Sequence, residues 1–195
     1  MPMPVHGRRT MEEPEGLATL TAVNQELYDE QSMVSGTPYT QLVFFTVPYG
    51  GTKTLDQTNL RLAGQIERPW HFHWYGIQLR ADHDISITSW GRVFDEAAIV
   101  MTIGTRDYIE LPCVQIPSGP AIAGLGGGVN YYTNGLQDVR NYKDVTVRRG
   151  RNRYPIDIPA GQSFRAEVKF AKSFTPVQDF SLMVTLLGIL YQGTQ

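Results

Sequence analysis

The chain has 195 residues, a length that suits one domain with a substantial buried core. Only 18% of the residues are charged and the net charge is −2, so no global field favours nucleic acid or an anionic membrane as a partner. A single cysteine excludes an internal disulfide framework, and we expect neither a secretory signal nor a membrane span because no apolar run is long enough for either.

Residues 1–35 are expected to form an N-terminal arm and one helix. Prolines gather in the first ten or so residues, which is typical of a mobile arm. From Glu15 to Gln31, apolar residues recur at helical spacing behind a group of glutamates that suits a helix N-terminus. The apolar stripe of this amphipathic helix would pack on the body of the chain or on a neighbouring copy.

Residues 36–195 are expected to form one β domain. The clearest strand is QSFRAEVKF, in which apolar and polar residues alternate as in a half-buried antiparallel strand. The expected inward set is Phe164, Ala166, Val168 and Phe170, and the expected outward set is Ser163, Arg165, Glu167 and Lys169. The closing FSLMVTLLGILYQ is apolar on both faces, which suits a central strand or one that contacts another subunit. Many strands without intervening helices favour a β-sandwich or a jelly roll.

Two histidines stand at alternate positions in PWHFHWYGIQL, residues 69–79. On a strand, Phe72 and the flanking tryptophans share one face and His71 and His73 share the other. The large aromatic side chains gain most from burial, so the histidines should point outward. Beyond Gly76 the apolar residues change parity, which indicates a β-bulge.

The same histidines resemble the first motif of the cupin family, in which a glycine precedes two metal-binding histidines. Gly64 is present, but Gln78 stands where that motif has an acid. The segment DIPAGQSF resembles the second motif, yet Phe164 replaces its histidine. His83 belongs to a polar RADHD turn. With two of four ligands missing, the sequence favours solvent- or subunit-facing histidines, and we expect no metal site, no cofactor and no catalytic residues.

The segment VTVRRGRNRYP carries the one cluster of positive charge, Arg148, Arg149, Arg151 and Arg153. A turn between two strands, with the guanidinium groups in water, explains the cluster most simply. It could also contact a neighbouring subunit or hold phosphates of a nucleic acid or of lipid head groups. Two further interpretations are structural: a rim loop for the glycine-rich residues 118–134, which lack the lysine of a phosphate-binding loop, and burial for Cys113.

Three segments are similar in style to coat proteins of tailless icosahedral bacteriophages, including those with an internal membrane: LVFFTVPYGG, DIPAGQSFRAEVKF and FSLMVTLLGILYQGTQ. The resemblance covers roughly residues 39 to 195. It implies an all-β chain with a single jelly-roll β-sandwich or barrel that assembles into rings, trimers and finally a shell. The chain is long enough for one barrel and too short for the double barrel found in many of these phages.

The expected function is therefore that of a self-assembling structural protein of a virus particle, without catalysis and without a small-molecule substrate. Expected partners are copies of itself and other virion proteins, with an internal membrane or nucleic acid as a candidate contact of the arginine cluster. The expected location is the virion, assembled in the host cytoplasm. His71 and His73, together with the arginine cluster, are the expected contact residues.

Two alternatives stay open. A cupin-like metal enzyme predicts a bound metal that is lost when His71 and His73 are replaced by alanine. A carbohydrate-binding β-sandwich would instead use aromatic residues in loops, such as Tyr131, Tyr132 and Trp90, to stack on sugar rings.

Overall fold

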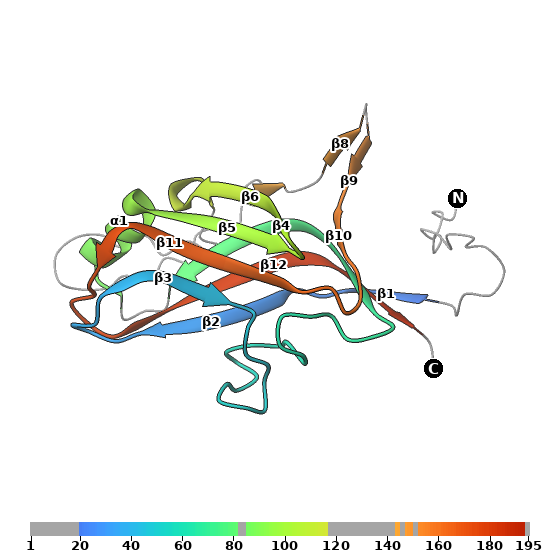
Figure 1. Ribbon diagram of the computed structural model, residues 1–195, viewed down its shortest axis with the longest axis horizontal. Coiled ribbons are helices and arrows are strands. Elements are labelled where there is room, and N and C mark those ends of the chain that lie inside the picture. The colour runs from blue at the N-terminus through green and yellow to red at the C-terminus, as the bar shows by residue number, and fades with distance from the viewer. Residues whose placement is uncertain (1–19, 82–84, 117–142, 145–146, 150–151, 194–195) are drawn as a thin grey trace, which may run out of the picture.

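The computed structural model describes residues 20–81, 85–116, 143–144, 147–149 and 152–193. They include two packed antiparallel sheets and a separate two-stranded sheet of β8 (Val147–Arg149) and β9 (Asn152–Tyr154) (Figure 1). The six-stranded sheet contains β1 (Leu20–Asn24), β2 (Leu27–Met33), β4 (His71–Ala81), β7 (Lys143–Asp144), β10 (Ile156–Ile158) and β12 (Phe180–Gly193). The four-stranded sheet contains β3 (Tyr39–Phe44), β5 (Ala97–Ile103), β6 (Arg106–Pro112) and β11 (Phe164–Phe174). The expectation of an all-β sandwich is confirmed.

The strand order in each sheet differs from the order along the chain. The six-stranded sheet runs β1-β12-β4-β10, with β2 also paired to β12 and β7 to β4. The four-stranded sheet runs β3-β11-β5-β6. From β2 to β5 and again from β10 to β12, each strand lies in the sheet opposite to that of the strand before it, whereas β5 and β6 pair within one sheet. Residues far apart in sequence therefore become neighbours.

The core lies between the two sheets and follows the expected alternation. On β11 the four expected inward residues are buried, and Arg165 and Lys169 are exposed on the other face. On β4, Phe72 and Trp74 are fully buried while His71 and His73 are only half-buried, so the predicted parity of this strand is confirmed. Apolar area removed from water on these inner faces is the main favourable term in folding.

The predicted irregularity at Gly76 is also present. Leu187 of β12 pairs with Gly76, but the next residue, Gly188, pairs with Trp74, so β4 carries one extra residue, Tyr75. A Cβ atom on Gly188 would lie 2.1 Å from Cζ of Phe72. Only glycine lets the two central strands approach this closely beneath the aromatic core.

Strand β12 is central, as one of the two interpretations of its apolar sequence required. It pairs with β4 along one side and with β1 and β2 along the other. Its residues are buried from Leu182 to Gly188 whichever face they occupy.

The prediction of an N-terminal helix from Glu15 to Gln31 is wrong for its described part, which begins at residue 20. Residues 20–24 and 27–33 are strands β1 and β2, which pair with the two halves of β12 and so join the sheet of the body. The inward side of β2 includes Asp29, which is fully buried. Because the charged Asp29 occupies a core position, the sequence of β2 lacks a clear alternation of apolar and polar residues. Pairing with β12 outweighed the local helical spacing.

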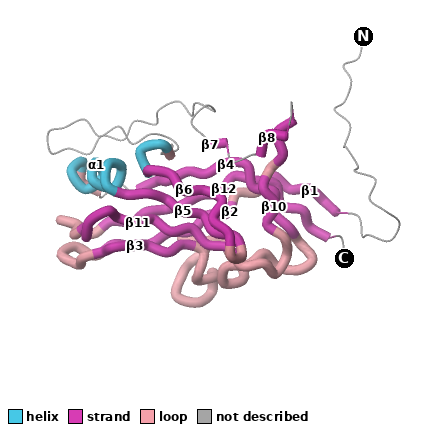
Figure 2. Tube along the Cα trace, turned by 45° about the horizontal axis from the view of Figure 1, so that its top comes forward, coloured by secondary structure: helices cyan, strands magenta, loops and turns pink. Residues whose placement is uncertain are grey.

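Helix α1 (Ile87–Glu96) lies at one end of the sandwich (Figure 2) and was not expected from the sequence. Ser86 caps it, with its side-chain oxygen accepting a hydrogen bond from the backbone N–H of Ser89 at 3.1 Å. Val93 is fully buried, and Trp90 packs edge-on against Phe94 with 4.4 Å between ring centroids. A short 3-10 turn, η1 (Cys113–Gln115), follows β6. Among the described residues no helix combines the length and the apolar character needed to cross a bilayer.

Residues 45–70 form a long excursion between β3 and β4, here called the 45–70 loop, which lies below the sheets in Figure 1. A buried ion pair fastens it: Nζ of Lys53 lies 2.8 Å from Oδ1 of Asp29 on β2. The same carboxylate accepts a hydrogen bond of 2.6 Å from the backbone N–H of Phe45. Although these bonds favour the charged form, burial dominates and raises the pKa of Asp29.

Candidate functional site

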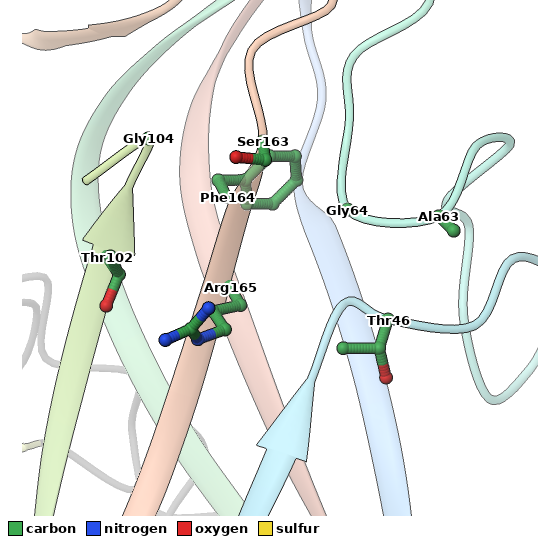
Figure 3. A pocket seen from close by; sticks show the side chains of 8 residues that line it. All are labelled: Thr46, Ala63, Gly64, Thr102, Gly104, Ser163, Phe164 and Arg165. Carbon is green, nitrogen blue, oxygen red and sulfur yellow. The ribbon is translucent and has the colours of Figure 1, made fainter.

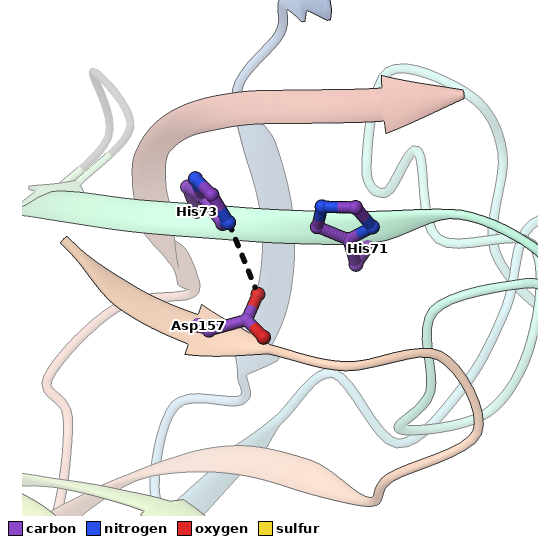
Figure 4. A group of neighbouring side chains, drawn as sticks. All are labelled: His71, His73 and Asp157. Atoms are coloured by element: carbon purple, nitrogen blue, oxygen red, sulfur yellow. Dashed lines mark ion pairs between the residues drawn. The ribbon is translucent and has the colours of Figure 1, made fainter. Parts of the chain in front are cut away.

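The two histidines of β4 lie beside a carboxylate on the outer face of the six-stranded sheet (Figure 4). Strand β10 pairs with β4 so that Asp157 stands opposite His73. Nε2 of His73 lies 3.4 Å from Oδ1 of Asp157. One candidate ligand atom from each of His71, His73 and Asp157 can be chosen so that all three lie within 4.8 Å of one another. Among the described residues, no other group of three or more His, Cys, Asp or Glu side chains converges in this way.

Strand β12 supplies an aromatic wall to the same cluster. Tyr191 pairs in register with His71, and their rings are stacked, with 4.8 Å between centroids and an interplanar angle of 10°. The same tyrosine ring lies 4.5 Å from the His73 ring, centroid to centroid. Both imidazoles are therefore oriented by contact with one neighbour.

The electrostatics of the cluster favour the neutral form of His73. Partial burial lowers the pKa of His73; the nearby Asp157 acts in the opposite direction, and His71 lowers the pKa further. A neutral imidazole has a free lone pair, which is the form that binds metal ions.

Asp157 is the residue of this cluster that the sequence analysis did not single out. The alternation in Ile156, Asp157 and Ile158, with the two isoleucines buried, is a sequence signal that it faces outward. No sequence signal, however, indicates that β10 pairs with β4, because Asp157 lies 84 positions after His73 along the printed chain. The structure thus adds an acidic third member to the predicted pair.

The arginine cluster lies apart from the histidines in sequence and forms the predicted pair of strands. Strands β8 (Val147–Arg149) and β9 (Asn152–Tyr154) are antiparallel, with Arg148 opposite Arg153 (Figure 1). Arg151 lies outside the described residues, as do the side chains of the other three arginines. Whether this hairpin contacts a subunit, a nucleic acid or a membrane stays a prediction.

The remaining expectations fall in two groups. His83, residues 118–134 and the two tyrosines named for sugar binding lie outside the described residues. Cys113 is fully buried, as predicted, and burial raises the pKa of its thiol to about 12. A thiol that stays protonated is a poor nucleophile.

The residues considered for the two alternative functions are placed as follows. Phe164, at the position of the missing cupin histidine, is buried between the sheets, whereas His71 and His73 lie on the outer face, so these positions do not converge. Gln78 is buried, and its amide nitrogen finds no hydrogen-bond partner among the described residues. Trp90 packs against the core and is not presented by a loop.

An open hollow of about 210 Å³ lies where the ends of β5 and β11 meet the 45–70 loop (Figure 3). Its lining comprises Thr46, Ala63, Gly64, Thr102, Gly104, Ser163, Phe164 and Arg165. The one ionisable group in this lining, the Arg165 guanidinium, is held by Glu167 at 2.6 Å. Of the hydroxyl groups in this lining, that of Thr102 donates a hydrogen bond of 2.7 Å to Oδ1 of Asp107 on β6.

Comparisons of the chain with protein-family models, with curated proteins and with solved structures found no match.

Proposed function

We propose that the chain is a self-assembling coat subunit of a virus particle, built on a jelly roll and acting by assembly alone. The observation that carries the proposal is the strand order of the two sheets. Viral coat domains are prominent among jelly rolls, in which eight strands form two four-stranded sheets through two Greek keys.

Eight strands of the two sheets, β2, β3, β4, β5, β6, β10, β11 and β12, can be matched to this pattern. One sheet contains β2-β12-β4-β10 and the other β3-β11-β5-β6. If they are lettered B to I along the chain, the two sheets become BIDG and CHEF, the order of a jelly-roll barrel. Strands β1, β7, β8 and β9 are additions to this frame.

The jelly roll also hosts lectins and cupins, so the fold alone does not select a coat protein. The cupin alternative loses support because Phe164, on the four-stranded sheet, is buried in the core, whereas the histidines lie on the outer face of the six-stranded sheet. The sugar-binding alternative loses Trp90, which packs against the core. A chain with only 18% charged residues fits a surface that neighbouring copies cover.

The 45–70 loop supplies a surface suited to a second copy of the chain. Three of its large apolar side chains are widely exposed: Tyr49 at 41%, Leu55 at 60% and Leu62 at 44%. Large exposed apolar side chains concentrated on one loop favour an interaction site.

The same loop is rigidly held, which a repeated contact requires. Besides the ion pair of Lys53 with Asp29, the backbone N–H of Tyr28 donates to Oδ1 of Asn59 at 3.0 Å. At the other end of the loop, the N–H of Phe164 donates to the carbonyl of Gly64 at 2.7 Å. A preorganised loop loses little entropy on contact with a neighbour.

The test is light scattering of the purified chain over a range of concentrations, followed by negative-stain microscopy. We expect rings, sheets or shells. A chain that stays monomeric at every concentration would contradict the coat proposal.

The loop is tested by the double variant Leu55→Asp/Leu62→Asp, which should stay monomeric because a charge in an apolar contact costs several kcal/mol, on the order of 2–5, of association free energy. Val114→Asp is the matched control, since Val114 is 60% exposed but lies on η1, away from the loop. Equal assembly of the double variant and the control would show that the contacts lie elsewhere on the chain.

A further inference from the structure

We propose that His71, His73 and Asp157 form a site for one divalent transition-metal ion, with Zn²⁺ as the reference ion, on the outer face of the six-stranded sheet. The inference does not depend on the coat proposal, because it rests on the side chains of this face alone.

The backbone places the three side chains on one surface. Two residues apart on β4, His71 and His73 project from the same face of the strand. Asp157 joins them because it stands opposite His73 in the antiparallel pairing of β10 with β4. Directly opposite residues have Cβ atoms about 4.5–5.5 Å apart, close enough for their side-chain ends to share an ion.

The spacing of His73 and Asp157 fits a shared ion better than a direct hydrogen bond. Zinc binds imidazole nitrogen and carboxylate oxygen at about 2.0–2.2 Å, so two ligands of a tetrahedral site lie about 3.3 Å apart. The observed separation of Nε2 of His73 from Oδ1 of Asp157 is 3.4 Å. A nitrogen–oxygen hydrogen bond would be nearer 2.9 Å.

His71 completes the set after a small adjustment. The widest separation among the three ligand atoms is at most 4.8 Å, and a tetrahedral site needs about 3.3 Å. Torsional rotation of a half-buried surface imidazole can supply this change without moving the strand. Tyr191, stacked on His71, limits where the ring can go and so favours one arrangement.

The chemistry of the ligands selects the class of ion. Two imidazoles and one carboxylate suit zinc and its neighbours in the first transition row, whereas calcium and magnesium prefer oxygen ligands throughout. Asp157 is 53% exposed on its side chain, so an ion can enter from solvent. Three protein ligands leave a coordination position for water or another ligand, as in open zinc sites.

The test uses the full chain after removal of metals with a chelator, titrated with zinc chloride in a calorimeter. We expect one Zn²⁺ per chain in the wild type. Loss of an outer-shell partner of a metal ligand weakens binding by about 10–100-fold, so His73→Ala and His71→Ala should each weaken it by more than about 100-fold. Absorption of the Co²⁺-loaded chain, which reports coordination geometry, should change in the same variants.

Two further variants keep the test decisive. Asp157→Asn preserves the shape of a mostly exposed side chain, so it should remain folded by circular dichroism and still lose at least about 10-fold in affinity. Tyr191→Phe keeps the ring stack and should bind zinc like the wild type.

His83→Ala is the matched histidine control, because His83 is flanked by Asp82 and Asp84 and could hold an ion by itself. Zinc binding that survives His71→Ala and His73→Ala, or that is lost only in His83→Ala, would overturn the proposal. So would a wild-type chain that takes up no zinc, or an Asp157→Asn variant with unchanged affinity.

Discussion

The outer faces of the two sheets each carry polar side chains at alternate strand positions, but the charges around these side chains are arranged differently. On β11 of the four-stranded sheet, Arg165, Glu167 and Lys169 project at alternate positions. Glu167 lies 2.6 Å from Arg165 and 2.9 Å from Lys169, one cation on each oxygen. On β4 of the six-stranded sheet, His71 and His73 have the same spacing, but their acidic neighbour comes from another strand and lies 3.4 Å from His73.

The comparison shows that spacing alone does not make a site. In the β11 ladder both oxygens of the Glu167 carboxylate are paired with cations of the same strand, so this carboxylate is already satisfied without a metal ion. Partial burial raises the pKa of Glu167, but hydrogen bonds from Lys169 and Arg165 outweigh it and lower the pKa overall. In the histidine cluster, electron-pair donors of three side chains lie within 4.8 Å of one another, which is the arrangement that a metal ion stabilises.

The largest effect is expected at the ion pair of Asp29 with Lys53, in which the carboxylate is fully buried and the lysine side chain is 11% exposed. Asp29→Ala should destabilise the fold by about 3–5 kcal/mol, because Lys53 would be left without its partner and the N–H of Phe45 without its acceptor. Urea denaturation measures the loss. Glu67→Ala is the control, since its pair with Arg61 is exposed and should contribute less than about 1 kcal/mol. Similar small losses in both variants would contradict the role given to Asp29.

The packing beneath the histidine face can be disrupted without replacing any of the three candidate ligands. Gly188→Ala should cost on the order of 3 kcal/mol, because the added Cβ would lie 2.1 Å from Phe72 and 2.6 Å from the carbonyl oxygen of His73. Gly91→Ala in α1 meets open space and should stabilise the chain by about 0.5–1 kcal/mol. Thermal unfolding of the two variants should shift in opposite directions, and a shift of the same sign would contradict this account of β4 and β12.

The charged ladder should matter little and should depend on salt. Glu167→Gln is expected to cost less than about 1 kcal/mol, and the cost should shrink at high salt because Arg165 and Lys169 are half exposed. The folded-state pKa of Glu167 is lowered from 4.5, so its stabilisation is present above that pH and is lost as the pH falls through the folded-state value. Denaturation at about pH 7 and at a series of lower pH values should therefore show the difference between wild type and variant shrinking as the pH falls. A difference that persists in acid would contradict the sign.

Replacing His73 by lysine should give the outer face of β4 an ion pair like those on β11. His73→Lys places a cation opposite Asp157 and should give a closed surface ion pair, with stability within about 0.5 kcal/mol of the wild type. The rise in melting temperature that zinc gives the wild type should disappear in this variant. A melting temperature that still responds to zinc would show that the ion binds elsewhere.

Much of the strand pattern could be predicted because alternation is a local property. The faces of β11, the outward histidines of β4 and the irregularity at Gly76 all follow from which residues gain most by burial. The error at residues 20–33 has an equally physical cause. An aspartate such as Asp29 is expected at the surface unless a partner for its charge is known. That partner, Lys53, lies in the 45–70 loop.

Only part of the candidate site could be predicted from the sequence. His71 and His73 are two residues apart, so their common face follows from the geometry of a strand. Asp157 enters through the pairing of β10 with β4, and Tyr191 through the pairing of β12 with β4. Helix α1 was missed because its sequence, ITSWGRVFDE, mixes β-branched residues and glycine with a polar cap at Ser86 that is easily taken for a turn.

The sequence by itself determined which residues face inward on the strands and that Cys113 is buried. It also allowed a central position for β12 and excluded an internal disulfide framework. Each of these features depends on composition or on neighbours along the chain. Only the tertiary structure decided that residues 20–33 join the sheet, that Lys53 reaches Asp29, and that a carboxylate stands beside the two histidines. Those contacts join strands and loops from distant parts of the chain, and strand pairing across such distances is fixed by the packing of the whole sandwich rather than by any local preference.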